Sequence, residues 1–314
     1  MASNFPNGFL TGVTIRGIPI TQMHPGKVFW VNNSSVLAPN GIGGSDSGLG
    51  TYTQPFKTID YAIGRCTANR GDIIAVMPGH AENIATAGAI TSDVAGVAIV
   101  GLGAGTLRPK ISFTAAAGTY VISAANCSFY NIEWQANYAD VAIMLDISGV
   151  DGLSFENCYF TEAGTDLNWV IAVDLATGAD DISFRGCKFI GGDASNDTCI
   201  NGVAHAGFWI EDCYFAENVA QTSVIGLIAT SGNATDVWIR NCAFRSNVDG
   251  ALFLDFNGAA NSGVIDNCYF SSIDSAGAVT AGFDFTGGHM FECYVAGEAD
   301  SFGLVGGGTV YNNA

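Results

Sequence analysis

The chain has 314 residues, 48% of them hydrophobic, and 29 acidic side chains against 11 basic ones give a formal net charge of −18. The hydrophobic content is enough for a large core and excludes a globally disordered chain. The acidic balance repels phosphate groups, so it disfavours nucleic acid and anionic membrane surfaces as partners.

Residues 1–27 contain scattered apolar side chains and several turn formers, without a regular period. No basic region precedes a long apolar run, so we expect no secretory signal and synthesis in a cytoplasm. Burial of each apolar side chain contributes about 1.5–3 kcal/mol, which favours an extended arm packed on the body or on another subunit. A disordered tail is the alternative. The expected partner-binding residues are Phe5, Phe9, Leu10, Ile15, Ile18 and Ile20.

Residues 28–110 are expected to form an N-terminal cap and the first coils of a repeat. Residues 53–71 predict a capping helix with Thr53 as its N-cap and Pro55 in its first turn. Residues 72–80 predict the strand and turn that begin the first coil, and residues 97–100 predict the next strand. Such a cap is needed because a solenoid otherwise exposes its core and its strand edges at the end.

Residues 111–314 are expected to form the body, because a short pattern recurs there. A turn-forming residue precedes a cysteine, and an aromatic or apolar residue follows two positions later. Apolar residues also stand three and often five positions before the cysteine, so the alternation is that of two short strands joined by a bend. The cysteines are Cys127, Cys158, Cys187, Cys213, Cys242, Cys268 and Cys293.

A third strand is expected before most of these motifs, at residues 141–147, 170–175, 224–229, 251–256 and 278–285. Glycine follows most of these segments, which indicates turns. Three short strands per coil predict an all-β fold, a parallel β-helix in which equivalent residues stack about 4.8 Å apart. The motif cysteines are then expected to form one column inside the tube, where free cysteine packs as a small apolar side chain.

The segments Gln54-Pro55-Phe56-Lys57-Thr58-Ile59, Gly71-Asp72-Ile73-Ile74 and Gly101-Leu102-Gly103 occur in an order similar to the N-terminal cap of the pectate-lyase-like β-helix superfamily. With the repeats, the resemblance covers residues 28 to about 300 and implies a right-handed parallel β-helix. Lyases, glycosidases, epimerases, adhesins and viral proteins share this fold, so the resemblance does not fix a function.

The N-terminal segment Asn4-Phe5-Pro6-Asn7-Gly8, followed by the apolar arm, resembles bacteriophage virion proteins of the head decoration (cement) and tail types. This resemblance implies a structural protein on the outer capsid surface that binds the major capsid protein and forms a homotrimer. Several of the tryptophans near the repeats are expected to face outward and to contact other copies. They are Trp134, Trp169, Trp209 and Trp238.

Four aspartates on the third strands are the candidate catalytic residues if the chain is an enzyme: Asp146, Asp174, Asp255 and Asp284. Stacked carboxylates are suited to a glycosidase, or to oxygen ligation of Ca²⁺. Ala204-His205 and Ala229-Thr230 are expected to interrupt this column, and the arginines near the repeats fall on other strands. We therefore interpret the aspartates as solvated or interface residues, and the chain as a non-enzymatic protein.

Nine cysteines without a C-x-x-C pattern indicate reduced thiols, and neither a metal site nor a cofactor is expected. Two other functions stay open. One is a tailspike or fibre that recognises or cleaves host polysaccharide, and the other is a free polysaccharide lyase or hydrolase.

Overall fold

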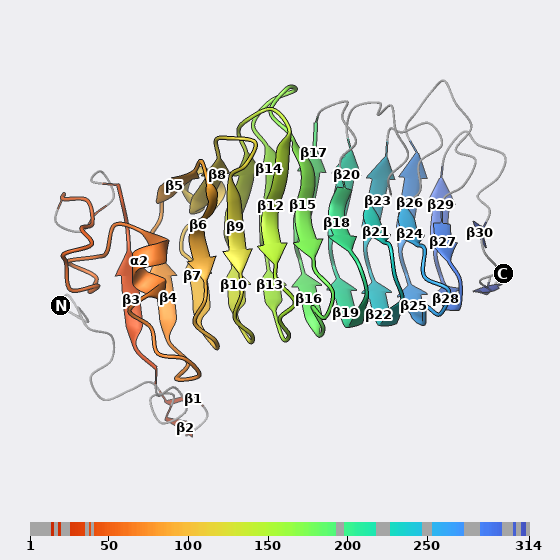
Figure 1. Ribbon diagram of the computed structural model, residues 1–314, viewed down its shortest axis with the longest axis horizontal. Helices are drawn as coiled ribbons and strands as arrows, with labels where there is room; N and C mark the ends of the chain where they lie inside the picture. Colours follow the sequence, from red (N-terminus) through yellow and green to blue (C-terminus); the bar gives the residue numbers. More distant parts are fainter. Residues whose placement is uncertain are drawn as a thin grey trace.

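The computed structural model describes residues 26–34, 38, 41–192, 198–217, 227–246, 253–272 and 283–296, and the backbone of four short terminal strands. Three parallel sheets of eleven, nine and nine strands run along one axis (Figure 1). This arrangement confirms the predicted all-β fold, a right-handed parallel β-helix. Within the described residues, no helix has the length and apolar character needed to cross a membrane.

From β4 onward, each coil contributes one strand to each sheet in turn. Sheet 1 contains β6 (Ala87–Ser92), β9 (Thr119–Ile122), β12 (Val141–Ile147), β15 (Trp169–Leu175), β18 (Thr198–Gly202), β21 (Ile228–Thr230), β24 (Leu254–Phe256), β27 (Phe283–Phe285) and β30 (Leu304–Val305). Sheet 2 contains β3 (Val28–Val31), β4 (Ile73–Val76), β7 (Ala98–Gly101), β10 (Ser128–Tyr130), β13 (Ser154–Glu156), β16 (Ile182–Arg185), β19 (His205–Glu211), β22 (Ala234–Arg240), β25 (Gly263–Asp266), β28 (Gly288–Phe291) and β31 (Thr309–Tyr311). Sheet 3 contains β5 (Ala81–Ile84), β8 (Lys110–Phe113), β11 (Glu133–Ala136), β14 (Tyr159–Glu162), β17 (Lys188–Gly191), β20 (Tyr214–Glu217), β23 (Ala243–Ser246), β26 (Tyr269–Ser272) and β29 (Tyr294–Ala296).

The bend between sheet 2 and sheet 3 is made by one residue in the left-handed region, where the motif predicts a turn. Its φ is 52° at Asn157, 61° at Gly186 and 55° at Asp212. Glycine, asparagine and aspartate adopt this conformation at lower cost than other residues, which explains their recurrence before the cysteine. A second column of left-handed residues, which includes Asn126 and Gly152, lies at the turn that enters sheet 2.

The interior column of cysteines has six members rather than the expected seven. Glu133 pairs with Tyr159, so the residue one coil before Cys158 in this column is Ile132. Ile132 is fully buried and fills the position that a thiol occupies in the later coils. The column therefore begins at Cys158 and runs to Cys293, which is only partly buried.

Cys127 is buried as expected, but it belongs to another column. Ser128 pairs with Ser154, which places the Cys127 thiol in register with Leu153 at the entrance to sheet 2. The turn before Cys127 therefore enters sheet 2, whereas the other motif turns leave it. Cys199, outside the motif, is also buried.

Phenylalanines form a further interior column on sheet 3. The ring centroids of Phe160 and Phe189 are 4.2 Å apart with an interplanar angle of 1°, and those of Phe189 and Phe215 are 4.8 Å apart at 6°. Parallel register places identical side chains directly above one another, and this stacking adds to the free energy gained from burial. The core is thus a set of repeating columns along the axis.

The helix near the N-terminus is much shorter than the predicted span of residues 53–71. Helix α2 spans Ile59–Ile63, and its N-cap is Thr58, whose hydroxyl accepts the Tyr61 N–H at 3.3 Å. The helix lies at the N-terminal end of the tube against β3, β4 and β6 (Figure 1). Its buried residues pack on the first strands, which is the position expected for a capping helix.

The expected N-cap of this helix, Thr53, is wrong. Thr53 and Pro55 precede the helix, because Phe56 forms a parallel bridge with Val31 and continues the sheet instead. A β-bridge and a helical turn require different backbone conformations, so the helix can begin only after residue 56. A short 3-10 helix, η1 (Gly105–Leu107), follows β7.

Most of the N-terminal arm lies outside the described residues, including Phe5, Phe9, Leu10 and Ile20. Ile15 and Ile18 belong to β1 (Thr14–Ile15) and β2 (Ile18–Pro19), which pair antiparallel. The role of the arm in partner binding stays a prediction. Of the third strands expected at 224–229, 251–256 and 278–285, the structure describes the residues from 227, 253 and 283 onward.

Candidate functional site

A column of polar side chains runs along the outer face of sheet 1, and it contains two pairs of directly adjacent carboxylates. In the parallel register Asp146 is paired with Asp174, and Asp255 is paired with Asp284. The sequence predicted both pairs. From β12 to β27 the column consists, in chain order, of Asp146, Asp174, Asn201, Ala229, Asp255 and Asp284.

Strict alternation along each strand directs these aspartates outward. Leu145 and Ile147 on either side of Asp146 are buried. Successive side chains of a strand point to opposite faces, so the apolar neighbours fix the direction of the carboxylate. The same alternation applies to Asp255 on β24. The outward aspartates are themselves half-buried among their neighbours.

The expected interruption of the column at Ala204-His205 is wrong. Strand β18, which the sequence interpretation missed, places Asn201 next to Asp174, and its Nδ2 donates a hydrogen bond of 2.5 Å to Asp174 Oδ1. His205 belongs to β19 of sheet 2 and is buried there. The expected interruption at Ala229 is confirmed.

Burial and like charge both act on these carboxyl groups. Burial raises the pKa of Asp146, and the adjacent charge of Asp174 raises it further. The pKa of Asp255 is raised by burial and then by the charge of Asp284, whose own pKa is raised by burial. Neighbouring carboxyl groups whose surroundings shift a pKa are the arrangement that acid–base catalysis uses.

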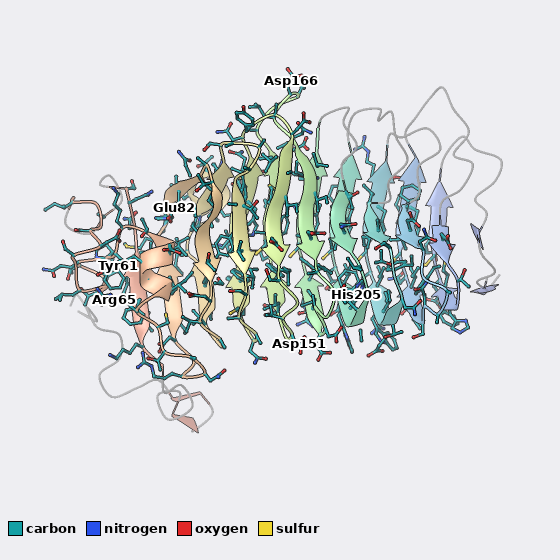
Figure 2. The ribbon with its side chains drawn as sticks, viewed as in Figure 1. Tyr61, Arg65, Glu82, Asp151, Asp166 and His205 are labelled. Atoms are coloured by element: carbon teal, nitrogen blue, oxygen red, sulfur yellow. The ribbon has the colours of Figure 1, made fainter. Side chains whose placement is uncertain are left out.

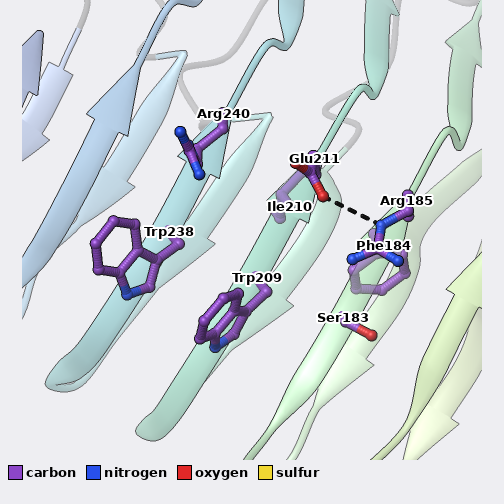
Figure 3. A pocket seen from close by; sticks show the side chains of 8 residues that line it. All are labelled: Ser183, Phe184, Arg185, Trp209, Ile210, Glu211, Trp238 and Arg240. Carbon is purple, nitrogen blue, oxygen red and sulfur yellow. Dashed lines mark hydrogen bonds and ion pairs between the residues drawn. The ribbon is translucent and has the colours of Figure 1, made fainter.

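A second surface feature, a shallow depression on the outer face of sheet 2, combines aromatic and charged side chains (Figure 3). Trp209 and Trp238 are neighbours in register, with ring centroids 5.9 Å apart and planes inclined by 28°. Trp209 is 50% exposed, although tryptophan is usually buried in large part. The residue beyond Trp209 in this column is Ser183, so the column of indoles ends abruptly there.

Charged side chains of alternating sign lie beside the tryptophans. Arg185 Nε and Glu211 Oε2 are 3.1 Å apart, and Arg240 Nη2 and Asp266 Oδ2 are 3.3 Å apart. Glu156 extends this row, with its Oε1 3.9 Å from Arg185 Nη1. These pairs are largely exposed, so each contributes little to folding stability.

Two of the four tryptophans near the repeats do not reach the surface. Trp134 and Trp169 are fully buried, and Trp134 lies in register with Phe160 in the phenylalanine column. Strand β11 thus uses an indole where the strands from β14 to β26 of sheet 3 use a phenyl ring. The expectation of outward tryptophans holds for Trp209 and Trp238 among the four.

The sequence contained a signal that separates the two groups. Trp209 and Trp238 each stand four positions before a column cysteine, Cys213 and Cys242. The alternation makes that position outward, because the residue three before the cysteine points inward. The residues two and four before each column cysteine therefore form the two outward columns of sheet 2.

Comparisons with known proteins support the fold alone. No protein-family model matches the chain, and no curated protein matches it. The structure is similar to that of a rhamnogalacturonan lyase, with a TM-score of 0.55 and 12% identity over 85% of this chain and 73% of the lyase. A pectate lyase, Pel9A, has a TM-score of 0.42 and 11% identity over 89% of this chain and 80% of that one. The fold is therefore that of a parallel β-helix, of the kind that the rhamnogalacturonan lyase has.

Proposed function

We propose that the chain is a structural protein of a bacteriophage particle, of the decoration type that stabilises the outer capsid surface. The observation that carries this proposal is the outer face of sheet 2, where exposed Trp209 lies among Arg185, Glu211 and Arg240. Tryptophan and arginine are enriched in protein interfaces and in their energetic hot spots. A sheet face of this composition is suited to assembly with other proteins.

The N-terminal arm is proposed to attach the body to the major capsid protein, because its apolar side chains favour burial. The net charge of −18 keeps the body away from packaged DNA. Synthesis in the bacterial cytoplasm and assembly on the outside of the head are part of this proposal. So is self-association, for which the resemblance to virion proteins suggests a trimer.

The test is attachment to particles that lack the protein. The full chain is mixed with such particles, the particles are pelleted, and the bound chain is quantified. Full-length protein should co-sediment, and protein without residues 1–27 should stay in the supernatant while its circular dichroism still shows a β-helix. Equal co-sedimentation of both forms would remove the arm from the proposal, and failure of the full chain to bind would remove the decoration function.

A second candidate function is recognition or cleavage of host polysaccharide, as a tailspike or as a free lyase or hydrolase. The adjacent pairs Asp146–Asp174 and Asp255–Asp284, in which burial and like charge raise pKa values, favour this function. The fold shared with a rhamnogalacturonan lyase is compatible with it.

Polysaccharide cleavage is tested by incubating the chain with host surface polysaccharide and measuring new sugar ends. The decoration proposal predicts no release above a blank. Release that is lost when Asp146 and Asp174 are both changed to Asn, and is kept in the surface control Asp166→Asn, would replace the structural proposal with an enzymatic one.

A further inference from the structure

The outward column of sheet 2 that contains Trp209 changes abruptly in side-chain size halfway along the tube. The step falls between β16 and β19, at the depression in Figure 3. From β7 to β16 the column is recessed, and from β19 to β28 it projects. The small half is Ala98, Ser128, Ser154 and Ser183, and the large half is Trp209, Trp238, Val264 and His289.

The neighbouring outward column, two residues further along each strand, changes sign from one strand to the next. Its charged members in order are Glu156, Arg185, Glu211, Arg240 and Asp266. An alternating row has a simple symmetry property. A two-fold axis placed between two adjacent members brings opposite signs together wherever a charge of one copy faces a charge of the other.

We propose that a second copy of this chain packs against sheet 2 about a two-fold axis that passes between β16 and β19, parallel to the strands and perpendicular to the tube axis. The two tubes then run antiparallel, with sheet 2 of one facing sheet 2 of the other. Such an isologous contact uses the same surface on both copies, so each pairwise contact occurs twice.

This axis places the large side chains of the column that contains Trp209 opposite the small side chains of the same column in the other copy. The recess above Ser183 receives the partner's Trp209, and the recess above Ser154 receives the partner's Trp238. Indole surface that is exposed in one chain becomes buried against serines of the other. Aromatic anchors buried in pockets carry much of the free energy of protein association.

The same axis pairs opposite charges in the second column. Arg185 faces the partner's Glu211, and Glu156 faces the partner's Arg240. Arg185 and Arg240 each contact a carboxylate of their own chain. In the dimer, each also contacts a carboxylate of the other chain. Complementary charges of this kind fix the register of a contact and exclude wrong registers.

The ends of the charged column match as well. Tyr130, which is 45% exposed, faces the partner's Asp266, whose carboxylate can accept the phenol O–H. Val100 faces the partner's Phe291, so the last contact is apolar. From β7 to β28 the matched face is roughly 34 Å long, taking about 4.8 Å per strand.

The two other placements below lose either the fit of large side chains into the recess or the pairing of opposite charges. An axis between β19 and β22 keeps opposite charges together but sets Trp209 against the partner's Trp238, which holds the sheets apart over the serines. An axis along the tube sets the charged column against the tryptophan column, so no ion pair forms across the contact. The step in size and the alternation in sign together select the axis between β16 and β19.

The face is open to a flat partner. The connections that flank sheet 2 are short, as in the six residues between β12 and β13 and the two between β13 and β14. Asp151, in the first of these, stays at the edge of the tube, whereas Asp166, in a connection from sheet 3 to sheet 1, projects from the opposite edge (Figure 2). A second tube can therefore approach sheet 2 without meeting the loop of Asp166.

This pairing rests on the self-association in the proposed function and deepens it, with a dimer in place of the trimer. The two are tested separately, because the proposed contact uses residues of strands β7 to β28 and none of residues 1–27. Two full-length variants, Arg185→Glu and Glu211→Arg, are studied alone and mixed, by sedimentation velocity at low salt. Wild-type protein should show a concentration-dependent monomer–dimer equilibrium. Each variant alone sets like charges opposite each other and should dimerise at least tenfold more weakly.

An equimolar mixture of the two variants should restore dimerisation. The new carboxylate at position 185 of one chain then faces the new guanidinium at position 211 of the other, and the second contact keeps its native pair. Rescue in the mixture cannot arise from changes within one monomer. A mixture that stays monomeric, a wild-type protein that is monomeric at all concentrations, or a trimer mass would overturn the pairing.

The fit of the tryptophans is tested by Ser183→Trp, which fills the recess without touching the core. It should abolish dimerisation, whereas the matched variant Ser271→Trp on the outer face of sheet 3 should leave it unchanged. Equal behaviour of the two variants contradicts the proposed contact. A wild-type monomer whose tryptophan fluorescence changes with an oligosaccharide would assign the face to sugar instead.

Discussion

Asp146 on β12 and Asp174 on β15 are direct neighbours in the parallel register, and the amide of Asn201 holds Asp174 through a hydrogen bond of 2.5 Å. Among the described residues, no basic side chain forms an ion pair with either aspartate. The charge of Asp174 therefore acts uncompensated on Asp146, and with burial it raises the pKa of that carboxyl.

Replacing Asp146 by Asn should raise the free energy of unfolding at pH 7 by about 0.2–1 kcal/mol, the range for one cross-strand pair. The folded pKa of Asp146 lies above its unfolded value of about 3.9. The wild-type protein therefore loses stability as the pH rises through the window between these two pKa values. The gain should therefore vanish once the pH falls below the window. Urea denaturation at about pH 7 and about pH 3.5, on either side of the window, measures both, with Asp166→Asn as the control. An equal gain in the control would refute the repulsion between the two aspartates.

Replacing Gly186 by Ala should destabilise the chain by about 1–2 kcal/mol, the cost of a left-handed backbone for a residue with a Cβ. Gly186 has a φ of 61°, and a Cβ there meets no atom within 4 Å, so the cost is conformational. Gly186→Asn should cost less, because asparagine occupies the same turn one coil earlier. Gly164→Ala, where a Cβ comes no closer than 3.7 Å, is the control and should be nearly neutral. Thermal denaturation ranks the three, and an Asn variant no better than Ala would contradict the role of the left-handed turn.

Phe189→Ala should cost about 3–5 kcal/mol, because the variant leaves a cavity in the stacked column. Phe189 lies between two rings in nearly parallel planes, at centroid distances of 4.2 and 4.8 Å. Tyr214→Ala, on the outer face of the same sheet, should cost about 1 kcal/mol or less. Chemical denaturation compares the two variants. Similar losses would show that the inner and outer faces are assigned incorrectly.

His205 should make the protein sensitive to acid. The residue is 5% exposed, neither ring nitrogen has a hydrogen-bond partner among the described residues, and burial lowers its pKa to about 4. The unfolded chain, with a histidine pKa of about 6.5, binds a proton in the window between these values. Stability should therefore fall as the pH decreases through this window, by at most about 3 kcal/mol.

The variant His205→Phe should lose this part of the pH dependence, because a phenyl ring does not titrate. The ring can pack beside Phe208 as the imidazole does. The exposed residue His289, changed to Gln, is the control and should keep the dependence. Melting temperatures measured between about pH 7 and about pH 4 provide the comparison. A His205→Phe protein that still loses stability as steeply as the wild type would place the acid sensitivity elsewhere.

The body of the fold was predictable because its signal is local and repeated. The five coils from Cys158 to Cys268 each contain a left-handed turn residue, an inward cysteine and an inward ring at fixed spacing, so one coil predicts the next. The outward direction of Asp146 followed from its two apolar neighbours by the same alternation. Periodicity of this kind survives insertions in the loops, because each coil packs only on its neighbours.

The errors have physical reasons as well. Asn126 and Cys127 have the sequence of the motif but lie at a different turn, as the pairing of Ser128 with Ser154 shows. The pairing of Glu133 with Tyr159 shows that Ile132 takes the cysteine position. Strand β18 follows a connection without a repeated spacing, so its asparagine was not aligned with the aspartates of sheet 1.

The face of sheet 2 was missed for a third reason. The complementarity of its columns appears only when residues from successive coils are set side by side, as their register requires. The separation of these residues along the chain varies with the length of each loop, so the columns appear in the sequence only when each residue is counted back from its own column cysteine.

The proposed function is tested most directly by electron cryo-microscopy of particles with and without this chain. The expected difference density is a set of rods on the outer surface of the head, each with its N-terminal end against the capsid. Density confined to the tail, or located inside the capsid, would contradict the proposal.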